Sequence, residues 1–324
     1  MRACALHDYI VSRRIVKLAG QIDIIHAWPL GSLRTLKVAA ELGIPTVLER
    51  PNTHTRYGYK VVQRECDRLG IILPPGDNHL YNRALLAKEE LEYEAAYKLL
   101  CPSELVAQTF SDYGFSREKL ARHSYGFDTT RFFPQENPRL VNSGFTLLFV
   151  GVCNVVKGLH FALEAWLKSP VHKQGKFLIV GDFAAGYAEK LSAMLSEPSV
   201  SVLGHQSDVS QLMRSSDALI LPSLTEGFAL VCAEAMGSGL VPLVSTACTE
   251  LCRNRENSLV HQIGDVATIA EHISLLDSDR VLLERLRSGA LATAPEVTWE
   301  RAGLRLRDVY IDVVKSYRCS HGVL

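Results

Sequence analysis

The sequence predicts an α/β protein with two domains, the second of which is built around a doubly wound parallel sheet. Its 324 residues correspond to two domains of ordinary size. Short apolar or β-branched runs alternate with longer amphipathic segments, which is typical of βαβ units. Residues 131–144 are rich in proline and asparagine and lack apolar periodicity. This change of texture predicts a boundary between domains 1–139 and 140–324.

The first domain is expected to contain only two or three strands. We expect strands at 22–27 and 46–48, and helices at 31–42, 84–99 and 104–113. Gly43 and Gly114 are suited to ending two of these helices, and Ser103 to capping the start of the last. The polar stretch 50–82 is interpreted as a long loop, and its length suggests a function of its own.

The second domain shows a more regular alternation. Strands are expected at 145–151, 177–181, 200–203, 218–221 and 241–244, and helices at 159–168, 188–196, 209–215 and 230–237. Helices then dominate, at 266–276, 280–293 and 299–314. We expect the last helix to pack back on the first domain.

Composition narrows the functional classes. Lys+Arg and Asp+Glu are both 35, and this neutral balance argues against a nucleic-acid partner. The eight cysteines form no Cys-x-x-Cys pair, which favours a reduced cytoplasmic protein. No apolar run reaches the roughly 20 residues of a membrane helix. We therefore expect a soluble protein, and a peripheral contact with the inner face of a membrane remains compatible with the sequence.

Lys157 lies in the first candidate ligand-binding segment, which runs from Gly151 to Gly158 between a strand and a helix. In open parallel sheets, ligands bind beyond the carboxyl ends of strands, near helix N-termini. A glycine at the strand exit allows close approach to the backbone. Lys157 opposes the helix dipole unless an anion lies between them. A solvated loop lysine fits this segment equally well.

Two glutamates mark the second segment. Glu226 follows the strand 218–221 and precedes Gly227, while Glu234 lies in the next helix among small apolar residues. A carboxylate in such surroundings requires donors, because burying an unpaired charge is costly. A pair of ligand hydroxyls would satisfy Glu234, and a buried salt bridge to an arginine is the alternative.

Glu226 and Glu234 form a Glu-x7-Glu arrangement within EGF-x5-EAM-x-SG. The set LLFVG, KG, LEAW, IVGD and ILPS accompanies it, with CPSELVAQTF and YGFDTTRFFP before the boundary. With these motifs, from about residue 22 to 310, the chain resembles the retaining glycosyltransferases of family 4. The resemblance implies the GT-B fold, two Rossmann-like domains facing a cleft, with the first one here incomplete. It also implies metal-independent sugar transfer, without a cofactor, from a UDP- or GDP-sugar to a carbohydrate or lipid acceptor.

The resemblance also implies roles for individual residues of the second domain. Lys157 would neutralise charge developing on the leaving diphosphate, and Glu226 would address the donor sugar. Glu234 would bind the ribose hydroxyls. The remaining donor-binding positions implied are Gly227, Phe228, Ala229, Leu230, Gly151, Gly204 and His205. At Gly204 and His205 the loop backbone, rather than the His205 side chain, would hold the base.

Histidines of the first domain also match family positions. His54, in ERPNTHT, would line the cleft and contact the donor sugar or the reacting centre. His26, in DIIHAW, is expected to support the cleft rather than to react. In the second domain, His160 is expected to face solvent on its helix.

Two departures from the family pattern bear on activity. Family members commonly place an arginine directly after the strand-end glycine, where this chain has Val152. Loss of one charge-assisted contact to phosphate costs about 1.5–3 kcal/mol unless another cation, such as Arg50 or Arg56, replaces it. Only 21 residues precede Ile22, where the family usually has a strand, a glycine-rich loop and a helix. The start codon is then misassigned, or this is a shortened form whose open sheet edge favours pairing with itself or with another chain.

These departures keep a second function class open, a non-catalytic nucleotide-sugar-binding or partner subunit on the same fold. Lys157, Glu226 and Glu234 favour the enzyme, because all three stand in place. A third possibility, a sugar-nucleotide epimerase on the GT-B fold, ranks below both because its motifs differ.

Overall fold

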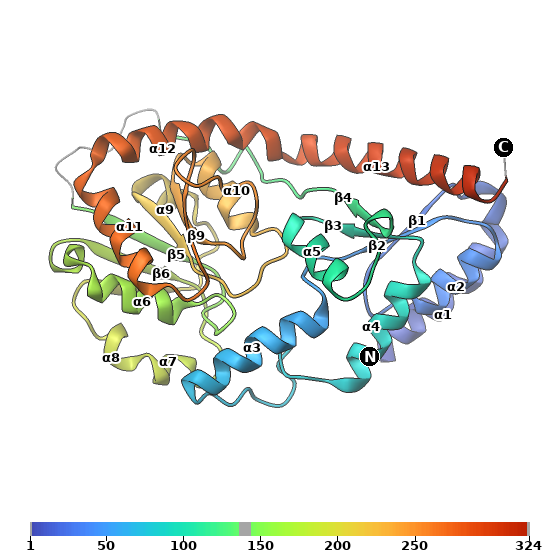
Figure 1. Ribbon diagram of the computed structural model, residues 1–324, viewed down its shortest axis with the longest axis horizontal. Helices are drawn as coiled ribbons and strands as arrows, with labels where there is room; N and C mark the ends of the chain where they lie inside the picture. Colours follow the sequence, from blue (N-terminus) through green and yellow to red (C-terminus); the bar gives the residue numbers. More distant parts are fainter. Residues whose placement is uncertain (1, 136–143, 323–324) are drawn as a thin grey trace. The chain divides into compact units, whose positions relative to one another are not determined.

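In the computed structural model, residues 2–135 and 144–322 are described, and the chain divides into two compact units (Figure 1). The first unit comprises Met1–Tyr59, His79–Ser124 and Ala302–Leu324, and the second comprises Lys60–Asn78 and Tyr125–Arg301. The boundary expected at 139/140 falls outside the described residues. The observed division differs from a single boundary, because residues 60–78 and 125–135 group with the second unit and 302–322 with the first.

A four-stranded parallel sheet forms the centre of the first unit. Its strands are β1 (Ile25–Ala27), β2 (Thr46–Glu49), β3 (Lys98–Cys101) and β4 (Leu120–Arg122), in that spatial order. The first two were expected, and the other two were missed. The predicted helix 84–99 was wrong at its end, because α4 (Arg83–Ala95) stops before β3 begins. A short strand that follows a helix after two residues cannot be told from the continuation of that helix by periodicity.

The helices of the first unit are α1 (Arg2–Leu18), α2 (Leu33–Glu41), α4 and α5 (Glu104–Asp112). The Ser103 hydroxyl accepts a hydrogen bond from the Val106 N–H, which confirms the predicted cap of α5. The expected loop 50–82 was partly wrong, since α3 (Thr55–Leu69) lies within it. Tyr59, Val62, Cys66 and Leu69 recur at helical spacing there and are buried, so the signal was present despite the polar average.

The second unit contains a six-stranded parallel sheet in the order β10-β9-β8-β5-β6-β7. Its strands are β5 (Thr146–Val150), β6 (Lys176–Val180), β7 (Val200–Gly204), β8 (Ala218–Leu221), β9 (Val241–Ser245) and β10 (Leu259–His261). Five of them confirm the predicted strands to within one or two residues. The sequence prediction missed β10, whose three residues are too few to show a period.

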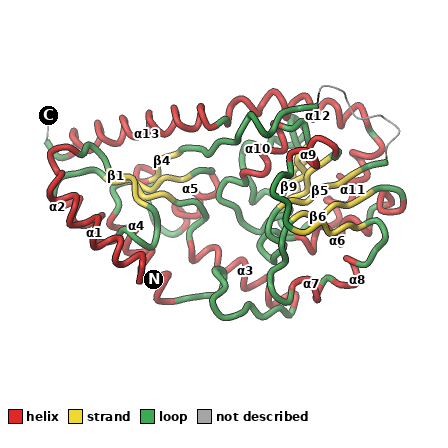
Figure 2. The backbone as a smooth tube through the Cα atoms, turned by 180° about the vertical axis from the view of Figure 1, so that it is seen from behind, coloured by secondary structure: helices red, strands yellow, loops and turns green. Residues whose placement is uncertain are grey.

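Helices connect these strands, as the backbone tube in Figure 2 shows. They are α6 (Leu159–Lys168), α7 (Tyr187–Lys190), α8 (Ser192–Leu195), α9 (Ser210–Ser215), α10 (Leu230–Gly237), α11 (Val266–Ser278) and α12 (Arg280–Thr293), followed by α13 (Trp299–Ser320). The single helix expected at 188–196 is two short helices. α6 packs against α8 and α11, whereas α10 packs against α12 and β9. α13 is shared, because its residues from Ala302 onward group with the first unit.

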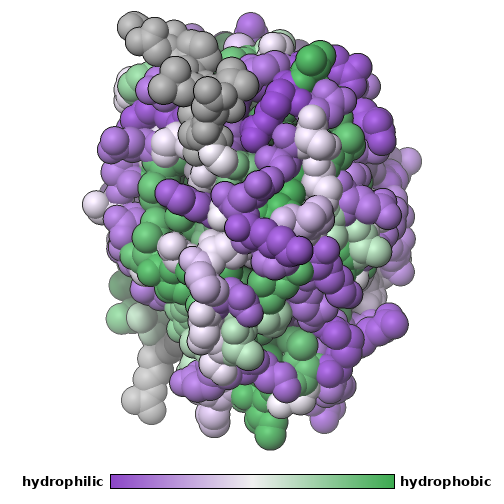
Figure 3. Space-filling view, turned by 90° about the vertical axis from the view of Figure 1, so that its left-hand side faces the viewer, coloured by the Kyte–Doolittle hydropathy of each residue, from purple (hydrophilic) through white to green (hydrophobic). Residues whose placement is uncertain are grey.

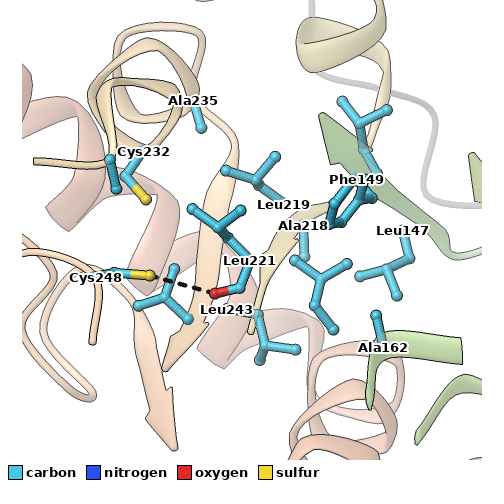
Figure 4. Packing of buried hydrophobic residues seen from close by; sticks show 14 of the residues in the cluster. Leu147, Phe149, Ala162, Ala218, Leu219, Leu221, Cys232, Ala235, Leu243 and Cys248 are labelled. Carbon is cyan, nitrogen blue, oxygen red and sulfur yellow. Dashed lines mark hydrogen bonds between the residues drawn. The ribbon is translucent and has the colours of Figure 1, made fainter. Parts of the chain in front are cut away.

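The largest apolar core lies around the six-stranded sheet. Figure 4 shows part of it, where Leu147 and Phe149 from β5 lie near Ala218 and Leu219 from β8. Such strands are apolar on both faces because helices cover both sides of a parallel sheet. On the outer face drawn in Figure 3, hydrophilic and hydrophobic side chains are interspersed, as is ordinary for a protein surface.

Six of the eight cysteines are buried, and only Cys4 and Cys319 are exposed. Burial raises the pKa of the Cys66 thiol to about 11 and that of the Cys101 and Cys153 thiols to about 12. These thiols therefore behave as small apolar groups of the interior.

Candidate active site

The topology of the second unit locates its candidate site. From β5 the chain adds β6 and β7 on one side, and then returns to add β8, β9 and β10 on the other. The strand order thus reverses between β5 and β8, and ligands of open α/β sheets bind outside the carboxyl ends of strands at such a point. The two segments singled out in the sequence follow these two strands.

The loop after β5 is held by backbone contacts. Gly151 has a φ of +151° and donates its N–H to the Val180 carbonyl, and the Cys153 N–H donates to the carbonyl of Asp182. A Cβ on Gly181 would lie 1.9 Å from the Gly151 carbonyl oxygen. The ends of β5 and β6 therefore approach as closely as two glycines permit, which leaves exposed backbone at the strand exit.

Lys157 and Glu226 form an ion pair across the switch point. The Lys157 ammonium donates to Oε1 of Glu226 over 2.6 Å, and the Ser223 hydroxyl donates to the same oxygen over 2.7 Å. Burial alone would lower the pKa of Lys157, but the charge and hydrogen bond of Glu226 outweigh it and raise that pKa. The structure thus places the Lys157 ammonium and the Glu226 carboxylate side by side, fixed by their mutual hydrogen bond, where a ligand is expected.

The two loops that carry this pair are joined. The Leu224 N–H donates to the Val156 carbonyl over 2.8 Å. The Ser245 hydroxyl at the end of β9 donates to the Ser223 carbonyl, and the Cys248 thiol donates to the Leu221 carbonyl, the contact dashed in Figure 4. The loops that carry Lys157 and Glu226 are therefore held to each other and to the end of β9 by hydrogen bonds.

The start of α10 offers backbone donors next to Glu226. Ala229, its N-cap, has a φ of +55° and provides no side-chain cap. A non-glycine residue in the left-handed region is uncommon and is found where function demands it. Phe228 is buried with its ring against Tyr125, and Leu230 is partly exposed. The backbone from Gly227 to Leu230 thus forms an uncapped helix N-terminus, which favours anions.

Glu234 lies one turn further along α10 and is half-buried. Burial raises the pKa of its carboxyl, and the charge of Arg131 partly offsets this. No hydrogen-bond donor to its carboxylate is recorded among the described residues. The alternative of a salt bridge between Glu234 and an arginine is therefore not observed among the described residues. The Glu234 carboxylate is available to accept hydrogen bonds from ligand hydroxyls.

Gly204 and His205 lie at the carboxyl end of β7, the end at which the loops of Lys157 and Glu226 leave the same sheet. Gly204 has a φ of +67° and accepts the Gly181 N–H at its carbonyl. The His205 side chain is exposed. These two residues therefore present backbone rather than a fixed side chain.

His54 belongs to the first unit and is buried, with 2% of its surface exposed. Its ring stacks on Tyr113 at 4.4 Å and lies edge-on to Tyr93, and its Nδ1 accepts the Arg56 N–H. Burial and the charges of Arg50 and Arg56 lower the pKa of His54 to about 4. A neutral imidazole inside an aromatic cage results, and its Nδ1 is engaged by the backbone.

The arginines considered as substitutes for the missing cation have other partners in the first unit. Arg50 pairs with Glu89 and lies over the Tyr93 ring, and Arg56 pairs with Glu90. Val152 itself is 55% exposed. The position that the family fills with arginine is thus open to solvent here.

Sequence reasoning missed a carboxylate shared by two histidines. Glu49, at the end of β2, contacts Nε2 of His26 at 3.2 Å and Nε2 of His123 at 2.9 Å. His26 also contacts the Tyr310 hydroxyl through Nδ1 at 2.6 Å. Both ring nitrogens of His26 are therefore engaged, which suits a supporting residue rather than a reacting one. The histidines lie 23 and 74 positions from Glu49, and Tyr310 lies 284 positions from His26, so no local pattern could reveal these contacts.

The expectation that His160 faces solvent was wrong. His160 is fully buried, with Nδ1 at 2.6 Å from the Tyr187 hydroxyl and Nε2 at 2.8 Å from Glu65. Arg68 pairs with the same carboxylate. Tyr187 comes from α7, whereas Glu65 and Arg68 come from α3. The segment of α3 was interpreted as loop from the sequence, and the burial of His160 was missed for that reason.

Comparison with known proteins gives a consistent picture. Residues 144–279 match the family model "Glycosyl transferases group 1". The chain is 25% identical over 335 residues to D-inositol 3-phosphate glycosyltransferase 1 of Catenulispora acidiphila, covering 94% of this chain and 75% of that protein. It is 25% identical to the N,N'-diacetylbacillosaminyl-diphospho-undecaprenol alpha-1,3-N-acetylgalactosaminyltransferase of Campylobacter jejuni, covering 70% of this chain and 63% of that protein.

Solved structures extend the likeness to the whole chain. The Anabaena protein HepE, crystallised with UDP, superposes with a TM-score of 0.68 at 19% identity, covering 98% of this chain and 82% of that one. Sucrose-phosphate synthase from Thermosynechococcus elongatus gives a TM-score of 0.71 at 16% identity, covering 95% and 78%. Together with the two parallel-sheet units, these likenesses confirm the predicted GT-B fold.

Proposed function

We propose that this chain, which has a GT-B fold and resembles group 1 glycosyltransferases, is a hexosyltransferase-type enzyme that moves a sugar from a UDP- or GDP-sugar to a carbohydrate or lipid acceptor. We assign it to family 4, with retention of configuration, without a metal ion or cofactor, and in the biosynthesis of polysaccharide or related glycans. The observation that carries the proposal is the Lys157–Glu226 pair at the switch point of the second sheet.

The names of similar proteins support these substrate classes. Two acceptors named there are an inositol phosphate and a diphospho-undecaprenol lipid, one a carbohydrate-like and one a lipid molecule. HepE was crystallised with UDP and with UDP-glucose. We therefore place a UDP-sugar ahead of a GDP-sugar as the donor.

In the proposed mechanism the diphosphate lies at the N-terminus of α10. The N–H groups of Ala229 and Leu230 donate to it, and the Lys157 ammonium turns from Glu226 to the bridging oxygen. As the glycosidic bond breaks, negative charge grows on the leaving phosphate, and a held cation stabilises it without reorganisation. Glu226, relieved of Lys157, then accepts hydrogen bonds from hydroxyls of the donor sugar, together with the backbone of Gly227 and Phe228.

The nucleoside would lie along the same sheet edge. Glu234, which has no recorded donor, accepts the two ribose hydroxyls. The backbone at Gly204 and His205 holds the base, and Gly151 permits the diphosphate to approach the end of β5. Each of these roles uses a group that the second unit leaves available.

His54 remains the proposed catalytic residue of the first unit, although its ring is buried. A neutral imidazole can donate a hydrogen bond from Nε2 while Nδ1 accepts the Arg56 N–H. We propose that it acts on the donor sugar through that donor after the neighbouring aromatic side chains rotate away.

We also propose a cytoplasmic enzyme that contacts the inner face of a membrane and pairs with itself or with a partner chain. No described helix is both long and apolar enough to cross a bilayer. Nucleic acid is not among the proposed partners, because the net charge is zero.

A second candidate function, a nucleotide-sugar-binding subunit without catalysis, is favoured by one observation. Val152 stands exposed where the family places an arginine, so one diphosphate cation is missing. Such a subunit would bind the nucleotide without releasing a sugar.

A thermal-shift titration with UDP, GDP and ADP, followed by an assay of donor turnover, separates the candidates. A ligand at about 100 times its dissociation constant adds about 2.7 kcal/mol to the free energy of unfolding. Glu234→Ala should abolish most of this shift, while Glu271→Ala, an exposed residue of α11, should leave it intact. A shift with turnover supports the enzyme, and a shift without turnover supports the subunit. No shift from folded protein contradicts both.

A further inference from the structure

One face of helix α1 combines exposed apolar and basic side chains. Leu6, Ile10, Arg13 and Lys17 are spaced by four, three and four residues, so they form one stripe along the helix. Leu6 is 60% exposed and Ile10 55% exposed, although both are large and apolar. Neither belongs to an apolar cluster recorded for the described residues. We call these four residues the α1 stripe.

The charge beside the α1 stripe has one sign. Arg13, Arg14 and Lys17 are exposed, and Asp8 is the one acidic residue of the helix sequence. Asp8 points inward, because its carboxylate accepts the N–H groups of Arg34 and Thr35 at the start of α2. No carboxylate of α1 therefore neutralises the exposed cations.

The neighbouring helix extends the positive charge. The Arg34 guanidinium lies over the Tyr9 ring at 4.8 Å, and both side chains are exposed. Cations that lie around exposed apolar groups match a surface which is apolar below and anionic above.

An apolar pocket adjoins the α1 stripe. Its volume is about 470 Å³, and its lining includes Ala3, which lies next to Leu6 on the helix surface, with Cys4 and Val11. Trp28, which also lines the pocket, is 58% exposed. Tryptophan is an amphipathic side chain enriched at the level of lipid headgroups.

From this geometry we propose that the α1 stripe binds the surface of an anionic lipid bilayer. Leu6 and Ile10 enter the boundary between headgroups and acyl chains, and Arg13, Arg14 and Lys17 pair with lipid phosphates. A bilayer is the favoured occupant because exposed cations of one sign flank exposed apolar side chains on the same helix, an arrangement that matches anionic headgroups above acyl chains. The inference rests on the proposed function insofar as it assigns the peripheral membrane contact of that enzyme to one helix.

Co-sedimentation of the full chain with vesicles tests the proposal. The chain should bind vesicles of phosphatidylcholine with about 30% phosphatidylglycerol and bind phosphatidylcholine vesicles far more weakly. Raising the salt from about 0.1 M to about 1 M shortens the screening length from about 10 Å to about 3 Å and should release it.

Variants separate the two parts of the stripe. Arg13→Gln and Lys17→Gln should each weaken binding about fivefold, as expected for one cation near an anionic surface. Leu6→Gln with Ile10→Gln should abolish binding, while glutamine preserves helix propensity. Val281→Gln and Arg285→Gln, exposed residues of α12, are matched controls and should change nothing.

Three results would overturn the proposal: equal binding to both vesicle types, retained binding by Leu6→Gln/Ile10→Gln, or self-association in light scattering that Leu6→Gln/Ile10→Gln removes without any vesicle binding. The last result would make the stripe a contact between chains. The nucleotide-induced thermal shift, measured on the same samples, should be unchanged in every α1 variant. Failure of the membrane proposal is thereby distinguished from failure of the proposed enzyme.

Discussion

A Cβ on Gly158 would lie 2.2 Å from the carbonyl oxygen of Pro222. Gly158 follows Lys157, and Pro222 opens the loop that carries Glu226. The two loops of the candidate site therefore meet at a point where only hydrogen fits. The φ of Gly158 is +69°, so the backbone conformation also favours glycine.

Gly158→Ala should consequently destabilise the second unit by more than about 2 kcal/mol, since the left-handed conformation alone costs about 1–2 kcal/mol. Urea unfolding measures this loss, and nucleotide binding should weaken with it. Gly303→Ala in α13 is the control. Nothing lies within 4 Å of its Cβ position, and the change should stabilise the helix by about 0.5–1 kcal/mol. Equal effects of the two substitutions would contradict the close approach.

Removing Lys157 should separate folding from catalysis. In Lys157→Met, Glu226 keeps only the Ser223 hydroxyl of the two recorded donors, so stability should fall by roughly 1–3 kcal/mol. Donor turnover should fall by about 10²–10³, the usual cost of one oxyanion-stabilising group. Lys157→Met/Glu226→Gln should regain the stability but not the turnover. Lys168→Met, exposed at the other end of α6, should affect neither quantity.

Restoring the missing cation should strengthen diphosphate binding. Val152→Arg places a guanidinium directly after Gly151, and Val152 is exposed enough for the longer side chain to fit. A charge-assisted hydrogen bond contributes about 1.5–3 kcal/mol, which corresponds to at least about tenfold in affinity. Calorimetry should show this gain for the nucleoside diphosphate and not for the nucleoside. Val202→Arg, on β7, should give no gain. An unchanged affinity would mean that position 152 does not face the diphosphate.

Acid should destabilise the fold through His261. Burial and the neighbouring His272 lower the pKa of His261 to about 3, and neither of its ring nitrogens has a hydrogen-bond partner among the described residues. Between its unfolded pKa of about 6.5 and the folded value, the unfolded chain binds more protons. The stability is therefore complete above about pH 6.5 and falls by about 1.4 kcal/mol per pH unit below it.

Urea unfolding at about pH 7 and about pH 5 measures this slope, and His261→Leu should reduce the difference by about 2 kcal/mol. Part of the slope should remain, because burial and the charges of Arg50 and Arg56 lower the pKa of His54 to about 4. His205→Leu, an exposed position, is the control. A slope unchanged by His261→Leu would show that the imidazole is not buried in solution.

The second unit was predictable because its elements carry local signals. Its buried strands are continuous apolar runs, and the motif around Glu226 and Glu234 lies within a single strand–loop–helix segment. The sequence pattern placed Lys157 and Glu226 in loops after strands but did not predict their ion pair, which forms because the two loops leave adjacent parallel strands. Local pattern failed where an element was short, as in β10, or where a polar average hid an amphipathic helix, as in α3.

Contacts between distant segments were not predictable in either unit. Glu49 joins His26 to His123 only after the four strands of the first sheet have paired. His160 is buried because α3 brings Glu65 to it. His54 looked like a cleft residue, and its aromatic cage comes from α4 and α5, tens of residues away.

The burial of the cysteines turns thiol chemistry into a measure of opening. Cys4 and Cys319 are the two thiols that a reagent reaches in the folded chain, and the other six lie inside it. Labelling beyond two equivalents then proceeds only as fast as the structure opens, because a buried thiol is inaccessible to the reagent. Cys101 reports on the first unit and Cys232 on the second. The labelling rates of Cys101 and Cys232 therefore measure the opening of the first and the second sheet separately, without any added probe.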